Sequence, residues 1–303
     1  MTRRAPAIDR TRLAAAGRMV LCLGTALLAS IIILAAATAG PAYGRTRRAG
    51  VAAALGSRML LRALGIRLLT TGAARDGAAL VVANHVSWVD ILAITATSPV
   101  VPVAKCEVAH WPLIGPLARR TGTVFVSRRI GRDLPATVDR ITSALRRGYR
   151  VLLFPEGTTT SGGPPGAFHR AGFQAAVDAA APVQPVSIDY ADRRGRPTGS
   201  TAFVGDDTLL ASTWRVLRAG PVLVRVRWHT PAAATEDGGH RAHHRARAAD
   251  DARGRISHAL GAESHPVDPR RVATNVTSVS RRPSRRALSR NPVIAVDRPD
   301  RAA

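Results

Sequence analysis

A short polar motif carries the residue types that proton transfer needs. In residues 84–90 (NHVSWVD), a histidine, His85, stands five positions before an aspartate, Asp90. If a helix begins near Ser87, its first turn returns the Asp90 carboxylate toward the imidazole. His85 could then take a proton from an attacking hydroxyl, while Asp90 fixes its tautomer and stabilises the imidazolium. Alone, such a pair is also typical of an ordinary surface histidine.

A second polar motif, residues 154–158 (FPEGT), supplies a carboxylate and a flexible turn. Both motifs directly follow apolar segments, and α/β sheets place their ligands at the carboxyl ends of parallel strands. We expect Glu156 to hold a substrate hydroxyl, and Gly157 to let the backbone approach a ligand closely. A plain strand-to-loop turn would explain Pro155 and Gly157, but it gives Glu156 no use.

Two basic residues between these motifs are candidates for binding an anion. Lys105 is the single lysine among 44 basic residues, and its compact ammonium differs in reach and hydration from a guanidinium. Arg128 comes just after an apolar segment and could clamp a phosphate with two parallel hydrogen bonds. Either residue taken singly also fits a solvated surface charge.

Short apolar segments separated by helical stretches must position these motifs. The apolar segments are 79–83, 100–104, 123–127, 151–154, 183–188 and 222–228. Most are apolar throughout, as is typical of strands buried on both faces. Residues 134–147 and 168–180 read as helices. The alternation predicts an α/β domain whose mostly parallel sheet is flanked by helices.

The amino-terminal part of the chain predicts a membrane helix. Residues 19–39 carry no charge over 21 positions, enough for a helix to cross a bilayer core. Arginines on both flanks favour a cytoplasmic amino terminus only weakly, so a helix that returns or lies along one leaflet stays open. A cleaved signal sequence is a further alternative. Residues 46–64 suit either an interfacial helix or an ordinary amphipathic one.

The composition points to a polyanionic partner. The formal net charge is +24, 46% of residues are hydrophobic and 4% are aromatic. So few aromatics argue against a sheet that stacks RNA bases, and two cysteines exclude a disulfide scaffold. The membrane helix favours anionic lipid over nucleic acid as the partner. Three histidines, at 240, 243 and 244, lack cysteine or well-placed carboxylate neighbours, so we expect no metal site.

Taken together and in order, the motifs resemble those of the 1-acylglycerol-3-phosphate (lysophosphatidate) acyltransferase family. Residues 84–90 look like its His-x4-Asp block, and residues 154–158 look like its Glu-Gly block. Residues 105–115 with 122–128, and then 183–186 (VQPV), look like the two remaining blocks. The resemblance covers residues 72–230.

The resemblance implies transfer of an acyl chain from acyl-CoA or acyl carrier protein to 1-acylglycerol 3-phosphate, giving phosphatidate for phospholipid synthesis. His85 would be the general base and Asp90 its orienter. The implied acceptor-binding residues are Lys105, Arg128, Glu156, Gly157 and Thr158. No cofactor, metal or acyl-enzyme is implied, because the hydroxyl attacks the thioester directly. Expected partners are membrane lipids, the lysophospholipid acceptor and the acyl donor, with no nucleic acid.

This reading divides the chain into four parts. They are a basic arm (1–18), a membrane helix (19–39), an acyltransferase domain (45–230), and a polar helix followed by a disordered basic tail (231–303). We expect the protein at the cell membrane, with the catalytic domain facing the cytoplasm.

One departure from the family pattern leaves the acceptor open. Members that act on lysophosphatidate often carry arginine after Glu-Gly-Thr, whereas Thr159, Thr160 and Ser161 follow here. Relatives that acylate a lyso-aminolipid or another lysophospholipid share the chemistry. Two further alternatives are hydrolysis of a lipid ester or thioester by the same pair, and a non-enzymatic binder of anionic surfaces.

Overall fold

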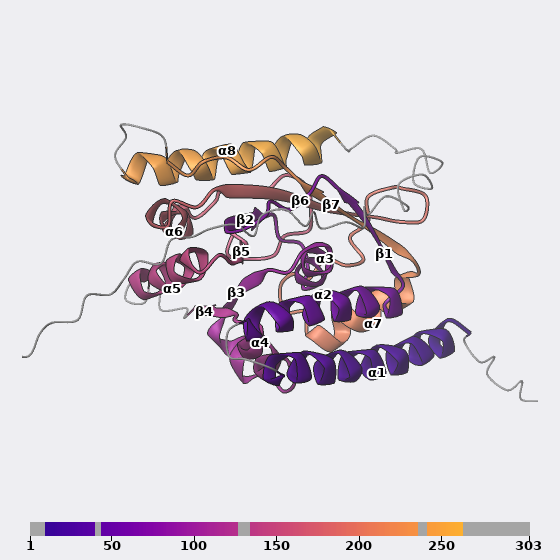
Figure 1. Cartoon of the computed structure of the whole chain (residues 1–303). Helices are drawn as coiled ribbons and strands as arrows, with labels where there is room; N and C mark the ends of the chain where they lie inside the picture. Colours follow the sequence, from indigo (N-terminus) through magenta and orange to yellow (C-terminus); the bar gives the residue numbers. More distant parts are fainter. Residues whose placement is uncertain (1–9, 40–43, 127–133, 236–240, 263–303) are drawn as a thin grey trace, which may run out of the picture. The chain divides into compact units, whose positions relative to one another are not determined.

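The computed structural model describes residues 10–39, 44–126, 134–235 and 241–262, which form helices around one seven-stranded sheet (Figure 1). The strand order is β1-β7-β6-β2-β5-β3-β4. The strands are β1 (Ile66–Thr71), β2 (Ala79–Ala83), β3 (Val101–Lys105), β4 (Val124–Val126), β5 (Arg150–Leu153), β6 (Val183–Ala191) and β7 (Val222–Trp228). All neighbours pair in parallel except β6 and β7, which are antiparallel. The predicted mostly parallel α/β architecture is confirmed.

Helices cover both faces of the sheet. On one face lie α2 (Arg45–Ala63), α3 (Val89–Thr97) and α7 (Leu209–Ala219), and on the other lie α5 (Leu134–Arg146), α6 (Gln174–Asp178) and α8 (Arg241–Ala262) (Figure 1). Strand β2 is buried along its whole length. Its side chains point alternately into the two hydrophobic cores, one on each face of the sheet. Val81 packs on the α3 side and Leu80 on the α8 side. An uninterrupted apolar strand is what two covered faces require.

The first helix, α1 (Arg10–Thr38), packs beside α2 and α7. Among the described residues it is the one helix long and apolar enough to cross a membrane, over Ala14–Thr38. Its buried side chains Ala15 and Cys22 belong to the same hydrophobic core as α3. At Gly56 of α2, an added Cβ would lie 2.8 Å from the Cβ of Ala29, so the two helices approach too closely for any larger residue.

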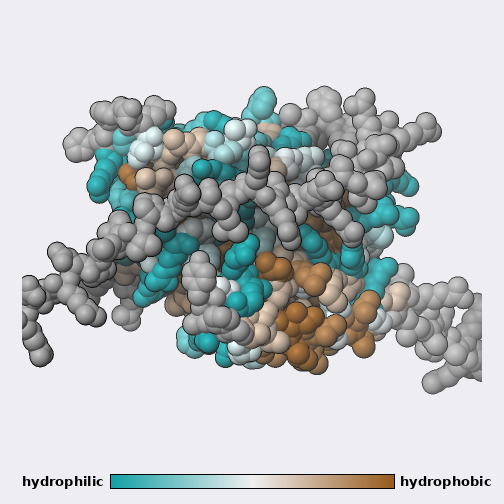
Figure 2. All heavy atoms as spheres, in the orientation of Figure 1, coloured by the Kyte–Doolittle hydropathy of each residue, from teal (hydrophilic) through white to brown (hydrophobic). Residues whose placement is uncertain are grey.

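The outer side of α1 and α2 is apolar and exposed. Figure 2 shows hydrophobic side chains gathered on the face where Figure 1 places α1. The exposed apolar residues of the two helices are Val20, Leu21, Leu23, Leu27, Leu28, Ile31, Val51 and Leu55. A contiguous apolar surface of this kind marks an interaction site on a soluble protein or a contact with lipid.

Several elements differ from the sequence-based expectations. Strand β1 was not predicted, and the helix expected over 168–180 is divided into a 3-10 helix, η2 (Arg170–Phe173), and α6. Between β3 and β4 the chain forms η1 (Cys106–His110) and α4 (Ile114–Arg120). Helix α8 begins at Arg241 and is not polar all round, because Ala252 and Ile256 are buried. Residues 1–9 of the basic arm and the tail over 263–303 lie outside the described residues.

Candidate active site

The two polar motifs meet at one edge of the sheet. Strands β2 and β5 are parallel neighbours, with Val82 beside Leu153, so the loops that follow them leave the sheet together. The prediction that residues 84–90 and 154–158 lie at the same edge of the sheet is therefore confirmed. Strand β3 lies on the other side of β5, pairs with it, and ends at Lys105.

His85 and Asp90 form the contact that their spacing predicts. Helix α3 begins at Val89, so Asp90 lies in its first turn, and its carboxylate Oδ2 lies 2.8 Å from His85 Nδ1. The Asp90 side chain is fully buried, whereas that of His85 is 18% exposed. An ionised carboxylate only accepts hydrogen bonds, so Nδ1 carries the proton and Nε2 of the neutral imidazole is the basic nitrogen.

Three further groups donate to the Asp90 carboxylate. The backbone N–H groups of Val86 and Ser87 donate to Oδ2 at 2.7 and 2.8 Å. The hydroxyl of Tyr190, in β6, donates to Oδ1 at 2.5 Å. Burial, together with the charge of Asp90, raises the pKa of Tyr190 well above its ordinary value, which keeps the hydroxyl protonated. Both oxygens of the carboxylate therefore accept hydrogen bonds, and its orientation is fixed from two sides.

The His85 imidazole is also fixed from the side. It stacks on the ring of Phe154, with centroids 3.9 Å apart and planes 15° from parallel. The second loop also binds the backbone of His85. Thr160 donates to the His85 carbonyl from its N–H at 2.8 Å and from its hydroxyl at 3.2 Å. One loop therefore orients the base that the other carries.

Glu156 joins the two loops from a buried position. Its Oε1 accepts from the N–H of His85 at 2.9 Å, and its Oε2 accepts from the N–H of Gly166 at 3.0 Å. Both carboxylate oxygens thus bind backbone groups, and the side chain is almost fully buried. This arrangement gives Glu156 a structural task that the sequence did not indicate. Its contact with a substrate hydroxyl stays a prediction.

The remaining predicted site residues surround this centre. Gly157 has a φ of 70°, and a Cβ there would lie 3.3 Å from Cδ2 of His169, so the turn needs glycine. Thr158 and Lys105 are exposed. Arg128 lies outside the described residues. The binding roles of all these residues stay predictions.

Two residues that tie the site together were not given roles from the sequence. Asn84 is buried, and its side-chain amide donates to the Ile188 carbonyl at 2.8 Å and accepts from the Ile188 N–H at 2.9 Å. It extends the pairing of β2 with β6 past the end of β2. Tyr190 then reaches Asp90 from 100 residues away in sequence. The signal available in the sequence was a tyrosine two positions after the apolar segment 183–188.

The threonines that replace the expected arginine bind backbone groups. The Thr159 hydroxyl donates to the carbonyl of Phe203, whose N–H donates to the Val86 carbonyl at 3.0 Å. Thr160 donates to His85, as described above. These side chains hold three segments of the site together, and an arginine at Thr159 would lose the hydroxyl bond.

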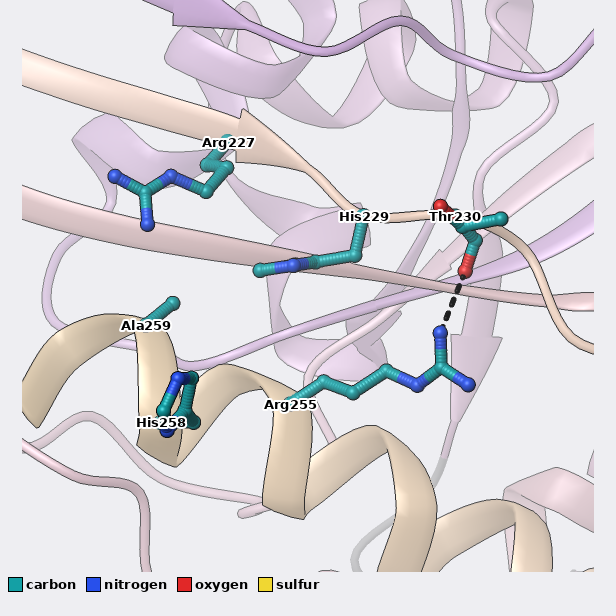
Figure 3. Close-up of a pocket in the computed structure, with 6 residues that line it drawn as sticks. All are labelled: Arg227, His229, Thr230, Arg255, His258 and Ala259. Atoms are coloured by element: carbon teal, nitrogen blue, oxygen red, sulfur yellow. Dashed lines mark hydrogen bonds between the residues drawn. The ribbon is translucent and has the colours of Figure 1, made fainter. Parts of the chain in front are cut away.

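A cavity of about 350 Å³ lies elsewhere, between the end of β7 and α8 (Figure 3). It is lined by Arg227, His229, Thr230, Arg255, His258 and Ala259. Arg255 donates to the Thr230 carbonyl at 3.3 Å. Burial and the charges of Arg227 and Arg255 lower the pKa of His229. None of these lining residues belongs to the polar motifs, so we place the chemistry at His85.

The arrangement around His85 suits removal of a proton from a hydroxyl. A buried anion holds one nitrogen of the imidazole, and the partly exposed ring presents the other. Such a base activates a neutral oxygen nucleophile. Within the described residues, no group of three or more histidine, cysteine or acidic side chains is arranged to hold a metal ion.

Comparison with known proteins identifies the family. A family model described as Acyltransferase matches residues 67–189, which include both polar motifs. The chain is 37% identical over 216 residues to the lyso-ornithine lipid O-acyltransferase of Pseudomonas aeruginosa, covering 71% of this chain and 80% of that protein. It is 38% identical over 157 residues to the 1-acyl-sn-glycerol-3-phosphate acyltransferase of Neisseria meningitidis, covering 52% and 61%.

A solved structure has the same fold. The 1-acyl-sn-glycerophosphate acyltransferase of Thermotoga maritima superposes with a TM-score of 0.64 over 86% of this chain and 98% of its own, at 18% identity. With this fold and with relatives that are enzymes, the non-enzymatic binder considered from the sequence is not supported. The chain belongs to the acyltransferase family and is an acyltransferase.

Proposed function

We propose that this enzyme transfers an acyl chain from a thioester donor to the free hydroxyl of a lysolipid, with His85 as the general base. The observation that carries the proposal is the 2.8 Å contact of His85 Nδ1 with the buried Asp90 carboxylate. It leaves Nε2 free to accept the proton of the acceptor hydroxyl.

The reaction follows from this geometry. As Nε2 of His85 takes the hydroxyl proton, the oxygen attacks the thioester carbonyl carbon and forms an ester bond. The carbon–sulfur bond breaks, and the thiolate leaves with the proton that His85 held. The Asp90 carboxylate stabilises the transient imidazolium. The donor is acyl-CoA or acyl carrier protein, a co-substrate, and no cofactor takes part.

The first candidate acceptor is 1-acylglycerol 3-phosphate. Two neisserial relatives, 38% and 37% identical over 157 residues, carry that activity in their names. Charge also favours this acceptor, because a phosphate monoester carries almost two negative charges at neutral pH and the chain has a net charge of +24.

A lyso-ornithine lipid is the second candidate, and two observations favour it. A relative that is matched over 80% of its length is named for that acceptor. In addition, Thr159 and Thr160 stand where an arginine would face a phosphate, and their hydroxyls bind backbone carbonyls. An ornithine head group carries an amine and a carboxylate in place of a phosphate.

Acceptor choice is tested with the full chain in mixed micelles, supplied with a labelled acyl-CoA or acyl carrier protein. We expect kcat/KM for 1-acylglycerol 3-phosphate to exceed that for a lyso-ornithine lipid by about tenfold or more, which corresponds to one charge-assisted contact. The reverse order would assign the enzyme to ornithine lipid synthesis. Release of free fatty acid without any acceptor would instead support hydrolysis.

The enzyme is associated with a membrane through its apolar helix α1, in keeping with relatives that act on lipids. We propose that its catalytic domain faces the cytoplasm, where the acyl thioesters are made. Five arginines precede the apolar segment and three closely follow it, at 45, 47 and 48. This bias weakly supports a cytoplasmic amino terminus.

The two cysteines allow a labelling test of this orientation. Cys106 is partly exposed in η1, and Cys22 is buried in the core. A membrane-impermeant maleimide should label Cys106 in broken cells and not in intact ones, with Cys106→Ala as the blank. Equal labelling in intact cells would place the domain outside.

A further inference from the structure

We propose that Tyr190 is a positioning residue of the acyl-transfer reaction, whose hydroxyl fixes the Asp90 carboxylate in the orientation that holds His85. This inference rests on the proposed role of His85 as general base. The hydroxyl contacts Asp90 Oδ1 at 2.5 Å, and the tyrosine is only 4% exposed.

The strand lengths explain how a residue of β6 reaches the site. Strand β2 has five residues and β6 has nine, and Ala83 at the end of β2 lies beside Val186. The second half of β6 therefore continues past β2 and runs beside the loop that carries His85. Asn84 binds both backbone groups of Ile188, and this fixes the register. Tyr190 follows two positions later, on the same face of the strand.

The distribution of donors around Asp90 shows what the hydroxyl contributes. Oδ2 already accepts from the His85 ring and from the N–H groups of Val86 and Ser87. Oδ1 accepts from Tyr190. Without that hydroxyl, a buried anionic oxygen would lose its donor, and the carboxylate could turn about its Cβ–Cγ bond. Oδ2 would keep its three donors, but the plane of the carboxylate, and with it the angle of the hydrogen bond to His85, would be less restricted.

The charged groups on the neighbouring segments keep their own partners when the Tyr190 hydroxyl is removed. Glu156 binds backbone N–H groups, and Asp189 pairs with Arg225. The loss of the hydroxyl therefore acts on Asp90 and, through it, on His85.

The first test compares Tyr190→Phe with wild type in the acyl-transfer assay. We expect kcat to fall about tenfold, the equivalent of one hydrogen bond to a charged group, while KM for the acceptor stays near its wild-type value. The matched control is Tyr149→Phe, which removes a hydroxyl from a tyrosine that packs against the other core.

A double-mutant cycle separates positioning from general stability. If Tyr190 acts through Asp90, Tyr190→Phe should change the rate less than about twofold in an Asp90→Ala background. An equal loss in both backgrounds would overturn the proposal. If Tyr190→Phe keeps wild-type activity while His85→Ala is inactive, the role proposed for Tyr190 is wrong and the proposed function stands. An active His85→Ala would remove the proposed function itself.

A measurement on the wild-type protein covers the case in which Tyr190→Phe does not fold. With ¹³C at the tyrosine Cζ, the Tyr190 signal should remain that of a phenol at a pH where free tyrosine has ionised, because burial and Asp90 raise its pKa. Ionisation in step with free tyrosine would show that the hydrogen bond to Asp90 is absent.

Discussion

His85→Ala should lower kcat/KM for acyl transfer by about 10²–10⁴-fold, the usual contribution of a general base. The loss should fall on kcat, because the imidazole acts on the proton that moves in the transition state. The variant should fold, since the ring is partly exposed and its backbone contacts to Glu156 and Thr160 do not involve the imidazole.

The matched control is His243→Ala, which removes an exposed histidine from α8, outside the four motif blocks. It should keep wild-type kcat/KM in the same labelled-donor assay. Comparable losses in both variants, or a His85→Ala enzyme within a few-fold of wild type, would mean that another group takes the proton.

Asp90→Asn should lower kcat by about 100-fold with little change in KM. The amide can keep its oxygen toward His85, Val86 and Ser87 while its NH2 donates to the oxygen of Tyr190, so the loop should keep its shape. What is lost is the negative charge that stabilises the imidazolium, a charge-assisted hydrogen bond worth about 1.5–3 kcal/mol.

Thermal unfolding of Asp90→Asn and wild type distinguishes this explanation from misfolding. We expect the two midpoints to lie close together, because the amide can keep the contacts to Val86, Ser87 and Tyr190. A clearly lower midpoint for the variant would indicate a displaced loop.

Local sequence patterns were enough to predict most of the sheet. The apolar segments 79–83 and 222–228 coincide with β2 and β7. Every side chain of β2 is buried, whereas only every second side chain of β7 is. The alternation of arginine with apolar residues in 224–228 was the available sign that one face of β7 is less covered than those of β2. Strand β1 was missed because half of its residues are exposed at the sheet edge and it closely follows α2.

The site was predictable where its residues are close in sequence. A helix that begins beside the motif brings Asp90 to His85 over five positions, so spacing alone predicted the contact. Tyr190 and the backbone partners of Glu156 come from strand register and loop packing across long separations. No local pattern contains that register, which depends on how β6 lies against β2.

The packing of α1 bears on how the newly made chain is processed. Ala15 and Cys22 close the same core that α3 and α7 form, and Gly56 fits against Ala29. A signal peptidase that cut after Ala39 would strip these side chains away and expose apolar surface along α2 and α7 to water. We therefore expect the mature enzyme to keep its first helix as part of the fold, and a version truncated after Ala39 to have an incomplete core.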